Sequence, residues 1–266
     1  GGKTPLVSSV LMNALPAVVA GVSRIIMCTP PTQNGTVEPH ILAAALEAGV
    51  TEVYKLGGAQ AVAAMAFGTG TVPRVDKIVG PGNNYVTMAK RLVYGEVGLD
   101  FLAGPSEIII VADETASPRL VAADLLSQAE HGPVDEAAAT LLTPSASLLA
   151  ETAREVERQL QALSRKEIAR ASLEKNGGLI LTRDLAEAVD LANFAAPEHL
   201  ELMVAEPYYW LTKIRHAGAI FLGSFTPESV GDYVAGTNHV LPTGGTARFA
   251  SALSVDDFVK KSSFVA

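Results

Sequence analysis

The sequence has one cysteine, one tryptophan and no cluster of lysine and arginine. Because Cys28 stands alone, a disulfide within the chain and a zinc site made of several thiolates are both excluded. The 20 Lys and Arg residues are outnumbered by 28 Asp and Glu residues, which gives a formal net charge of −8 over 266 residues. This charge does not attract a phosphate backbone or an anionic membrane, so we expect no nucleic-acid binding.

Long apolar runs are also missing. The best candidate, residues 10–22, is interrupted by Asn13, Pro16 and Gly21, and a membrane-spanning helix needs roughly 18–20 apolar residues. The first residues lack the charged segment followed by an apolar one that marks a secretion signal. We therefore expect a cytoplasmic protein with no membrane partner. The chain has neither a Met start nor a helix-ending tail, so we expect it to be the middle of a longer one.

Alternating patterns predict the fold class. Hydrophobic residues make up 48% of the chain, which is enough for a packed core. Short β-branched runs alternate with Ala- and Leu-rich helical patterns, which is typical of α/β folds with mainly parallel sheets. The predicted strands are residues 24–29, 51–55, 77–79, 107–112, 138–142, 179–181, 200–204 and 219–222. The predicted helices are residues 39–48, 59–67, 84–94, 118–128, two stretches within 147–174, and 184–194.

One series of elements stops near Gly104 and the next begins at Glu107. We therefore predict two α/β domains, residues 1–105 and 106–253, followed by a polar segment, residues 254–266, that is helical at best.

Glycine-rich turns are the first candidate sites. The segments 57–60 and 80–84 follow predicted strands and open helices, where backbone amides can meet an anion. Neither segment matches GxGxxG, and tight strand-to-helix turns explain both equally well. Both stand at the carboxyl ends of successive predicted strands, however, where open α/β sheets bind ligands, and this placement favours a ligand site. Gly2-Lys3-Thr4 resembles the end of a phosphate loop, although Pro5 stands where its helix should begin, which favours an accidental match.

Polar residues near a helix end and in a loop suggest metal chemistry. Gln128 and His131 are three positions apart, so both face the same side of the last helical turn and could hold a divalent metal. The alternative is a helix-ending histidine that interacts with the helix dipole. Asp232 lies in a polar, glycine-punctuated loop and is either a metal ligand or a turn residue.

Adjacent acid and base residues occur at Glu198 and His199, in a predicted connection between a helix and a strand. Loops on a rigid sheet commonly carry catalytic groups, so this pair suits proton transfer, and a solvated loop pair is the alternative. His40, His216 and Cys28 fit structural positions.

Read together, these segments resemble histidinol dehydrogenase. The resemblance covers nearly the whole chain and lies in SVLMNALPAVVAGV (9–22), LGGAQAVAAMAFGT (56–69), IVGPGNNYVTMAKR (78–91), AGPSEIIIVAD (103–113), DLLSQAEHG (124–132), APEHLEL (196–202) and GDYVAGTNHVLPTGGTARF (231–249). It implies two Rossmann-like domains. It also implies a family chain longer at both ends, with a glycine-rich motif cut at Gly1-Gly2 and a histidine-bearing C-terminal tail that begins after Ala266 and is truncated here.

The resemblance also implies an activity, namely the oxidation of L-histidinol through histidinaldehyde to L-histidine, the last steps of histidine biosynthesis. Two NAD molecules are used in succession by a homodimer with one zinc per subunit. Gln128, His131 and Asp232 match zinc ligands that also surround the substrate, and the fourth ligand is a histidine in the partner's tail.

The remaining roles follow in the same way. Glu198 and His199 match the acid–base pair, and His199 also faces the substrate. Ser106 matches a substrate contact, while Gln60 and Asn83 match NAD contacts.

Three alternatives stay open: a related zinc- and NAD-dependent dehydrogenase for another small diol or amino alcohol, a metal-dependent hydrolase or lyase without nicotinamide, and a non-catalytic binding protein.

Overall fold

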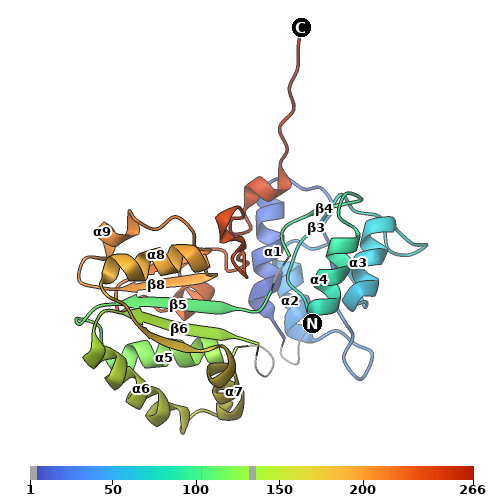
Figure 1. The fold of residues 1–266 in the computed structure, drawn as a ribbon. Helices are drawn as coiled ribbons and strands as arrows, with labels where there is room; N and C mark the ends of the chain where they lie inside the picture. Colours follow the sequence, from blue (N-terminus) through green and yellow to red (C-terminus); the bar gives the residue numbers. More distant parts are fainter. Residues whose placement is uncertain (1–4, 103, 132–135) are drawn as a thin grey trace. The chain divides into compact units, whose positions relative to one another are not determined.

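The computed structural model describes residues 5–102, 104–131 and 136–266, which form two α/β units. The first contains the described residues up to 102, with 237–240 and 252–266. The second contains those from 104 to 236, with 241–251 (Figure 1). The Gly2-Lys3-Thr4 motif lies outside the described residues.

The first unit alternates helices with short strands that pair in parallel, β1 with β2 and β3 with β4. Its strands are β1 (Ile26–Cys28), β2 (Glu52–Tyr54), β3 (Lys77–Ile78) and β4 (Gly98–Leu99). Its helices are α1 (Val7–Val19), α2 (Pro39–Glu47), α3 (Gly58–Phe67), α4 (Asn84–Leu92) and the 3-10 helix η2 (Val255–Phe258). Apolar side chains of α3, α4 and β3, among them Val62, Ile78 and Val93, form its core.

The second unit is built on a five-stranded parallel sheet in the order β7-β6-β5-β8-β9. The strands are β5 (Glu107–Ala112), β6 (Ala138–Thr143), β7 (Gly178–Leu181), β8 (His199–Met203) and β9 (Ala219–Leu222). The helices are α5 (Pro118–Ala129), α6 (Ala146–Leu160), α7 (Lys166–Asn176), α8 (Leu185–Ala195), α9 (Pro207–Leu211), α10 (Glu228–Tyr233) and the 3-10 helix η1 (Thr246–Arg248). The parallel strands in both units confirm the predicted α/β class.

Helices cover both faces of this sheet, with α5, α6 and α7 on one side and α8 and α9 on the other (Figure 1). Successive side chains of a strand point to opposite faces. Accordingly Ile108 and Ile110 pack with α5 and α6, whereas Ile109 and Val111 pack with α8. The central strand β5 is therefore buried on both sides, as its unbroken apolar sequence requires.

The register places polar side chains on the α5 face of β8. His199 pairs with Ile108 and Glu201 pairs with Ile110, so both polar residues share the face that α5 covers. On the next strand Phe221 pairs with Glu201 and lies on this face too. The sheet thus presents His199, Glu201 and Phe221 toward one side.

Two expectations about local structure are wrong. His199 begins strand β8 and is buried, because its ring nitrogen finds partners inside the unit, and the solvated-loop interpretation does not hold. Asp232 lies in the short helix α10 instead of a loop, since α10 packs against the sheet.

Within the described part of the chain, every helix is too short or too polar to span a bilayer.

Candidate active site

Glu198 and His199 lie side by side at the amino end of β8, next to the amino end of β5. Only 7% of Glu198 and 4% of His199 is exposed. Such burial is costly for an acid and a base unless each is hydrogen-bonded, so the partners of both side chains decide what they can do.

Two oxygen atoms lie within hydrogen-bonding distance of His199 Nδ1. The carbonyl oxygen of Glu107 lies 3.2 Å away and Oε1 of Gln128 lies 3.1 Å away. Because the carbonyl can only accept, Nδ1 carries the proton in the neutral ring. Nε2, the other ring nitrogen, lies 3.9 Å from Oε1 of Glu228 and holds the lone pair. His199 is therefore oriented as a base that acts through Nε2.

Glu198 receives two hydrogen bonds on one oxygen. The hydroxyl of Ser106 donates to Oε2 at 2.5 Å, and the amide of Glu107 donates to the same atom at 3.1 Å. Burial nevertheless raises the pKa of Glu198 to about 8, with these hydrogen bonds opposing the shift. A carboxyl with a pKa in this range can give or take a proton near neutral pH.

The backbone around Glu198 is held by a close approach of β9. The amide of Gly218 donates to the carbonyl oxygen of Pro197, and the amide of Ala219 donates to that of Glu198. A Cβ at Gly218 would lie 2.6 Å from the Glu198 carbonyl oxygen, so only glycine fits there. Before this segment, Ala196 ends helix α8 in a left-handed conformation with φ of 53°.

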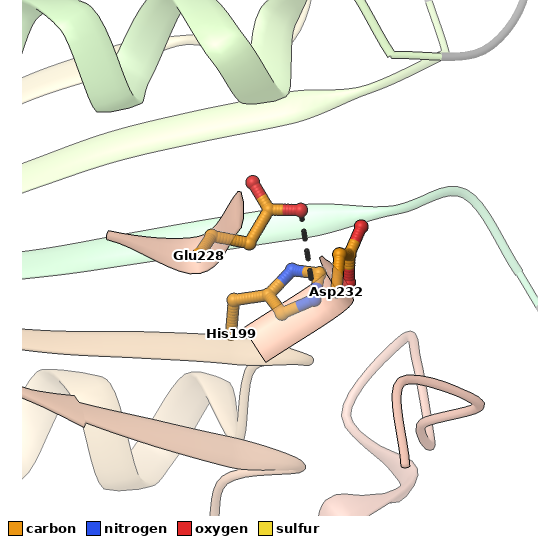
Figure 2. A group of neighbouring side chains, drawn as sticks. All are labelled: His199, Glu228 and Asp232. Carbon is orange, nitrogen blue, oxygen red and sulfur yellow. Dashed lines mark ion pairs between the residues drawn. The ribbon is translucent and has the colours of Figure 1, made fainter. Parts of the chain in front are cut away.

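Helix α10 brings two carboxylates to the imidazole (Figure 2). Candidate ligand atoms of His199, Glu228 and Asp232 all lie within 4.8 Å of one another. Burial first, and then repulsion from Asp232 and Asp124, raise the pKa of Glu228 to about 7. Since a cation between the two carboxylates would offset their repulsion, this cluster has the charge and the N and O donors that suit a divalent metal.

Glycine at position 231 lets α10 approach the sheet. A Cβ there would lie 2.7 Å from the ring of Phe221, and Gly231 is buried. The ring of Phe221 in turn lies 6.1 Å from that of His199, measured between centroids. Gly231 therefore sets the distance between α10 and strand β9, which pairs with the strand that carries His199.

The predicted metal ligands at the end of α5 lie in different surroundings. Gln128 is fully buried and contacts His199 through Oε1, while Nε2 of Gln128 has no hydrogen-bond partner among the described residues. His131 is exposed, and its ring is not one of the three groups in the cluster. Asp232 belongs to both the predicted ligand set and the observed cluster.

The predicted NAD contacts lie in the first unit, at the starts of two helices. Gln60 is exposed in the first turn of α3, which follows Gly57 and Gly58. Asn83 is exposed too, and its side chain caps α4 by accepting from the amides of Tyr85 and Val86.

A buried ion pair holds the turn before Asn83. Lys90 Nζ lies 2.6 Å from Oδ1 of Asp100, and both side chains are almost fully buried. Lys90 also donates to the carbonyl oxygen of Gly80, whose amide donates to Asp100.

Comparison with known proteins gives this geometry a family. The model for histidinol dehydrogenase matches residues 1–266. The chain belongs to the histidinol dehydrogenase family. It is 59% identical over 265 residues to the histidinol dehydrogenases of Bacillus cereus and Geobacillus kaustophilus.

A solved structure agrees. The crystal structure of histidinol dehydrogenase from Elizabethkingia anophelis superimposes with a TM-score of 0.94 at 47% identity, over 98% of this chain and 60% of that one. An acetylating aldehyde dehydrogenase from Geobacillus thermoglucosidasius, 13% identical with a TM-score of 0.59, shares the fold alone. Both matches include the whole of this chain. The chain spans only 61% of the length of the Bacillus protein and 62% of that of the Geobacillus protein.

Glu228 is a residue of this cluster that the sequence interpretation missed. It stands four positions before Asp232, the spacing that puts two side chains on one helical face. That signal was present, but the helix has only six residues and follows Pro227, so no periodic pattern marks it.

Proposed function

We propose that the protein containing this chain is a zinc- and NAD-dependent enzyme that oxidises L-histidinol through histidinaldehyde to L-histidine, the last steps of histidine biosynthesis, in the cytoplasm. Family membership supports the proposal. The observation that carries the proposal is the buried Glu198–His199 pair. Nε2 of His199 faces the carboxylate of Glu228 on helix α10.

In the first oxidation the alcohol must lose a hydride and a proton. His199 Nε2 takes the hydroxyl proton, because Nδ1 already carries one and is held by Glu107 and Gln128. Bound NAD would supply the hydride acceptor that this oxidation requires. The nearby carboxylate of Glu228 stabilises the imidazolium that forms.

In the second oxidation water must add to the aldehyde before another hydride can leave. Glu198 is the base for that water. Its two hydrogen-bond donors both approach Oε2, which leaves Oε1 for the proton. The raised pKa of Glu198 means that the proton, once taken, is held firmly enough to be carried away from the hydrated aldehyde.

Asp232, Gln128 and His131 would hold the zinc, and a histidine from the partner subunit of a homodimer would complete the ligand set. Zinc held there would supply a Lewis acid suited to the nitrogen donors of histidinol, which would help to orient the substrate. Of these ligands, Asp232 has structural support, because it lies in the cluster with His199 and Glu228, whose N and O donors suit a divalent metal. Ser106 would contact the substrate beside Glu198.

Gln60 and Asn83 would contact NAD at the starts of α3 and α4. The support is their exposure beside glycine turns that follow strands β2 and β3. Gly58 adopts a φ of +70°, a conformation that favours glycine, and it begins helix α3, whose first amides are the kind that can meet an anionic group.

The experiment is a substrate panel on the complete protein that carries these residues. Zinc-loaded protein and NAD are mixed with L-histidinol, a straight-chain amino alcohol or a small diol, and NADH and histidine are measured. We expect NADH only with histidinol. Equal turnover of an amino alcohol without imidazole would identify a different dehydrogenase, and turnover without NADH would identify a hydrolase or lyase.

A further inference from the structure

The buried ion pair of Lys90 and Asp100 in the first unit has no part in the proposed reaction. Lys90 stands in the last turn of α4, and Asp100 is the first residue after β4. Their side chains are 3% and 0% exposed. A buried ion pair often gives little net stability, because taking both charges out of water costs about as much as their attraction gains. The further contacts of the two charges are therefore the guide to their role.

Both charges are hydrogen-bonded to one residue, Gly80. Its amide donates to Oδ2 of Asp100 at 2.7 Å, and its carbonyl oxygen accepts from Nζ of Lys90 at 2.6 Å. Nζ of Lys90 also donates to the carbonyl oxygen of Phe101, at 3.4 Å. Gly80 lies two residues after β3 and has a φ of +108°, a conformation that favours glycine. Because its backbone donor and acceptor are both held, the direction of the chain at Gly80 is fixed by α4 and by the segment after β4.

The turn that starts at Gly80 leads directly to Asn83. Gly82 packs on the first turn of α4, where an added Cβ would lie 2.5 Å from the side chain of Val86. Oδ1 of Asn83 accepts from the amides of Tyr85 and Val86, both at 3.1 Å. With Oδ1 engaged in the helix cap, the exposed Asn83 offers a ligand its Nδ2 group, a hydrogen-bond donor. The direction of this donor follows from the path of the chain between Gly80 and α4.

We propose that Lys90 and Asp100 are positioning residues for cofactor binding, which hold the Gly80 turn so that Asn83 presents Nδ2 to NAD. The atom that Nδ2 meets is an oxygen acceptor of the dinucleotide, because this group only donates. Lys90 acts through the turn and not by attracting a phosphate, since its ammonium is buried against Asp100. This role rests on the proposed function, because it requires NAD at the start of α4.

Apolar replacements of similar shape separate this role from a contribution to folding. Lys90→Met and Asp100→Leu, made together, remove both charges, whereas either replacement alone would leave an unpaired charge in the core. The double variant should stay folded while the Gly80 turn loses both of its anchors. NADH affinity, measured by the fluorescence of the bound nicotinamide, should fall roughly tenfold, which corresponds to the loss of about one hydrogen bond.

A second double variant keeps one anchor. In Lys90→Met with Asp100→Asn, a side-chain oxygen can still accept from the amide of Gly80, so we expect a smaller loss of NADH affinity. This variant keeps the test available if Lys90→Met with Asp100→Leu does not fold. Arg24→Met with Glu52→Gln is the matched control, because it removes an ion pair of the same unit that lies on other elements. The control should leave NADH affinity unchanged.

Asn83→Asp tests whether the ion pair acts through Asn83. The carboxylate keeps both acceptor contacts of the helix cap but has no donor, so this variant alone should bind NADH at least roughly tenfold more weakly. Replacing the ion pair in the Asn83→Asp protein should then cost little more, because both changes remove the same hydrogen bond. Losses that add in full would overturn the proposal, since the pair would then affect binding by another route.

Kinetics and hydrogen exchange complete the test on the complete protein. Lys90→Met with Asp100→Leu should raise the KM for NAD, leave kcat at saturating NAD close to that of the wild type, and speed exchange over residues 78–83. Wild-type NADH affinity in this folded variant would overturn the role of the ion pair and leave the proposed function standing. A wild type that binds no NADH would refute the proposed function, and the role of the pair with it.

Discussion

Nδ1 of His199 lies 3.2 Å from the carbonyl oxygen of Glu107, and this contact assigns the roles of the two ring nitrogens. A backbone carbonyl only accepts, so the proton stays on Nδ1 and the lone pair of Nε2 points toward Glu228, 3.9 Å away. A backbone partner cannot be protonated or rotated away. The orientation of the base is therefore built into the pairing of β5 with β8.

Replacing Glu198 with glutamine should slow the second oxidation more than the first, because only the second needs an activated water. Loss of a general base costs roughly 10²–10⁴ in rate. The side-chain amide can still accept from Ser106 and Glu107, which keeps the local structure. Turnover is measured separately with histidinol and with histidinaldehyde, and equal losses for both would refute the assignment.

The two predicted ligands on α5 should behave differently. His131→Ala should remove zinc more completely than Gln128→Ala, because imidazole nitrogen is a stronger zinc ligand than an amide oxygen. Gln128→Ala should also disturb His199, since Gln128 Oε1 lies 3.1 Å from its Nδ1. Zinc content after dialysis and the pH profile of turnover distinguish the two effects. Earlier zinc loss in the Gln128 variant would contradict the ligand roles.

The centre of the second unit could be predicted from sequence because strand β5 is apolar on both faces. Strand β5 has the predicted bounds 107–112, and α5 ends one residue beyond the predicted 128. Such strands are recognised by composition alone.

Other elements depend on contacts between distant residues, which local sequence does not record. Helix α10 is stabilised by Glu201 and by the approach of Gly231 to Phe221. Helix α1 was not predicted as a helix, and it contains Pro16, a residue that interrupts helical patterns. The burial of His199 likewise follows from the pairing of β8 with β5, which no local pattern specifies.

Gly231→Ala should destabilise the protein and displace α10, because the new Cβ would lie 2.7 Å from the Phe221 ring. Overpacking of this kind costs about 1–3 kcal/mol in the free energy of unfolding. Adding Phe221→Leu should recover part of the loss by making room. Gly70→Ala, where nothing lies within 4 Å, is the control and should be close to neutral. Urea unfolding of the four proteins measures this, and a Gly231 variant as stable as the control would be inconsistent with the packing.

The metal-free protein should become less stable as the pH rises from about 5 to about 8. Burial raises the pKa of Glu198 to about 8 and that of Glu228 to about 7, so the folded state binds more protons than the unfolded chain in this range. The stability that the two protonated acids contribute is fully present below the pKa of a glutamate in the unfolded chain, near 4.5. It is lost as the pH rises through the pKa values of the folded state.

Each retained proton changes the free energy of unfolding by about 1.4 kcal/mol per pH unit. Glu198→Gln should therefore flatten the dependence, whereas replacing the exposed Glu47 with glutamine should not. Urea unfolding in the presence of a chelator gives the slope. A free energy of unfolding that rises over the same pH range would mean that Glu198 and Glu228 are ionised in the folded protein.

The most direct test of the account is the yield of NADH from a limiting amount of L-histidinol with zinc-loaded complete protein. The proposed use of Glu198 and His199 in successive steps predicts two NADH and one histidine per histidinol. It further predicts that Glu198→Gln stops near one NADH with histidinaldehyde as the product. A yield of two NADH from the Glu198 variant at the wild-type rate, or of one from the wild type, would contradict it.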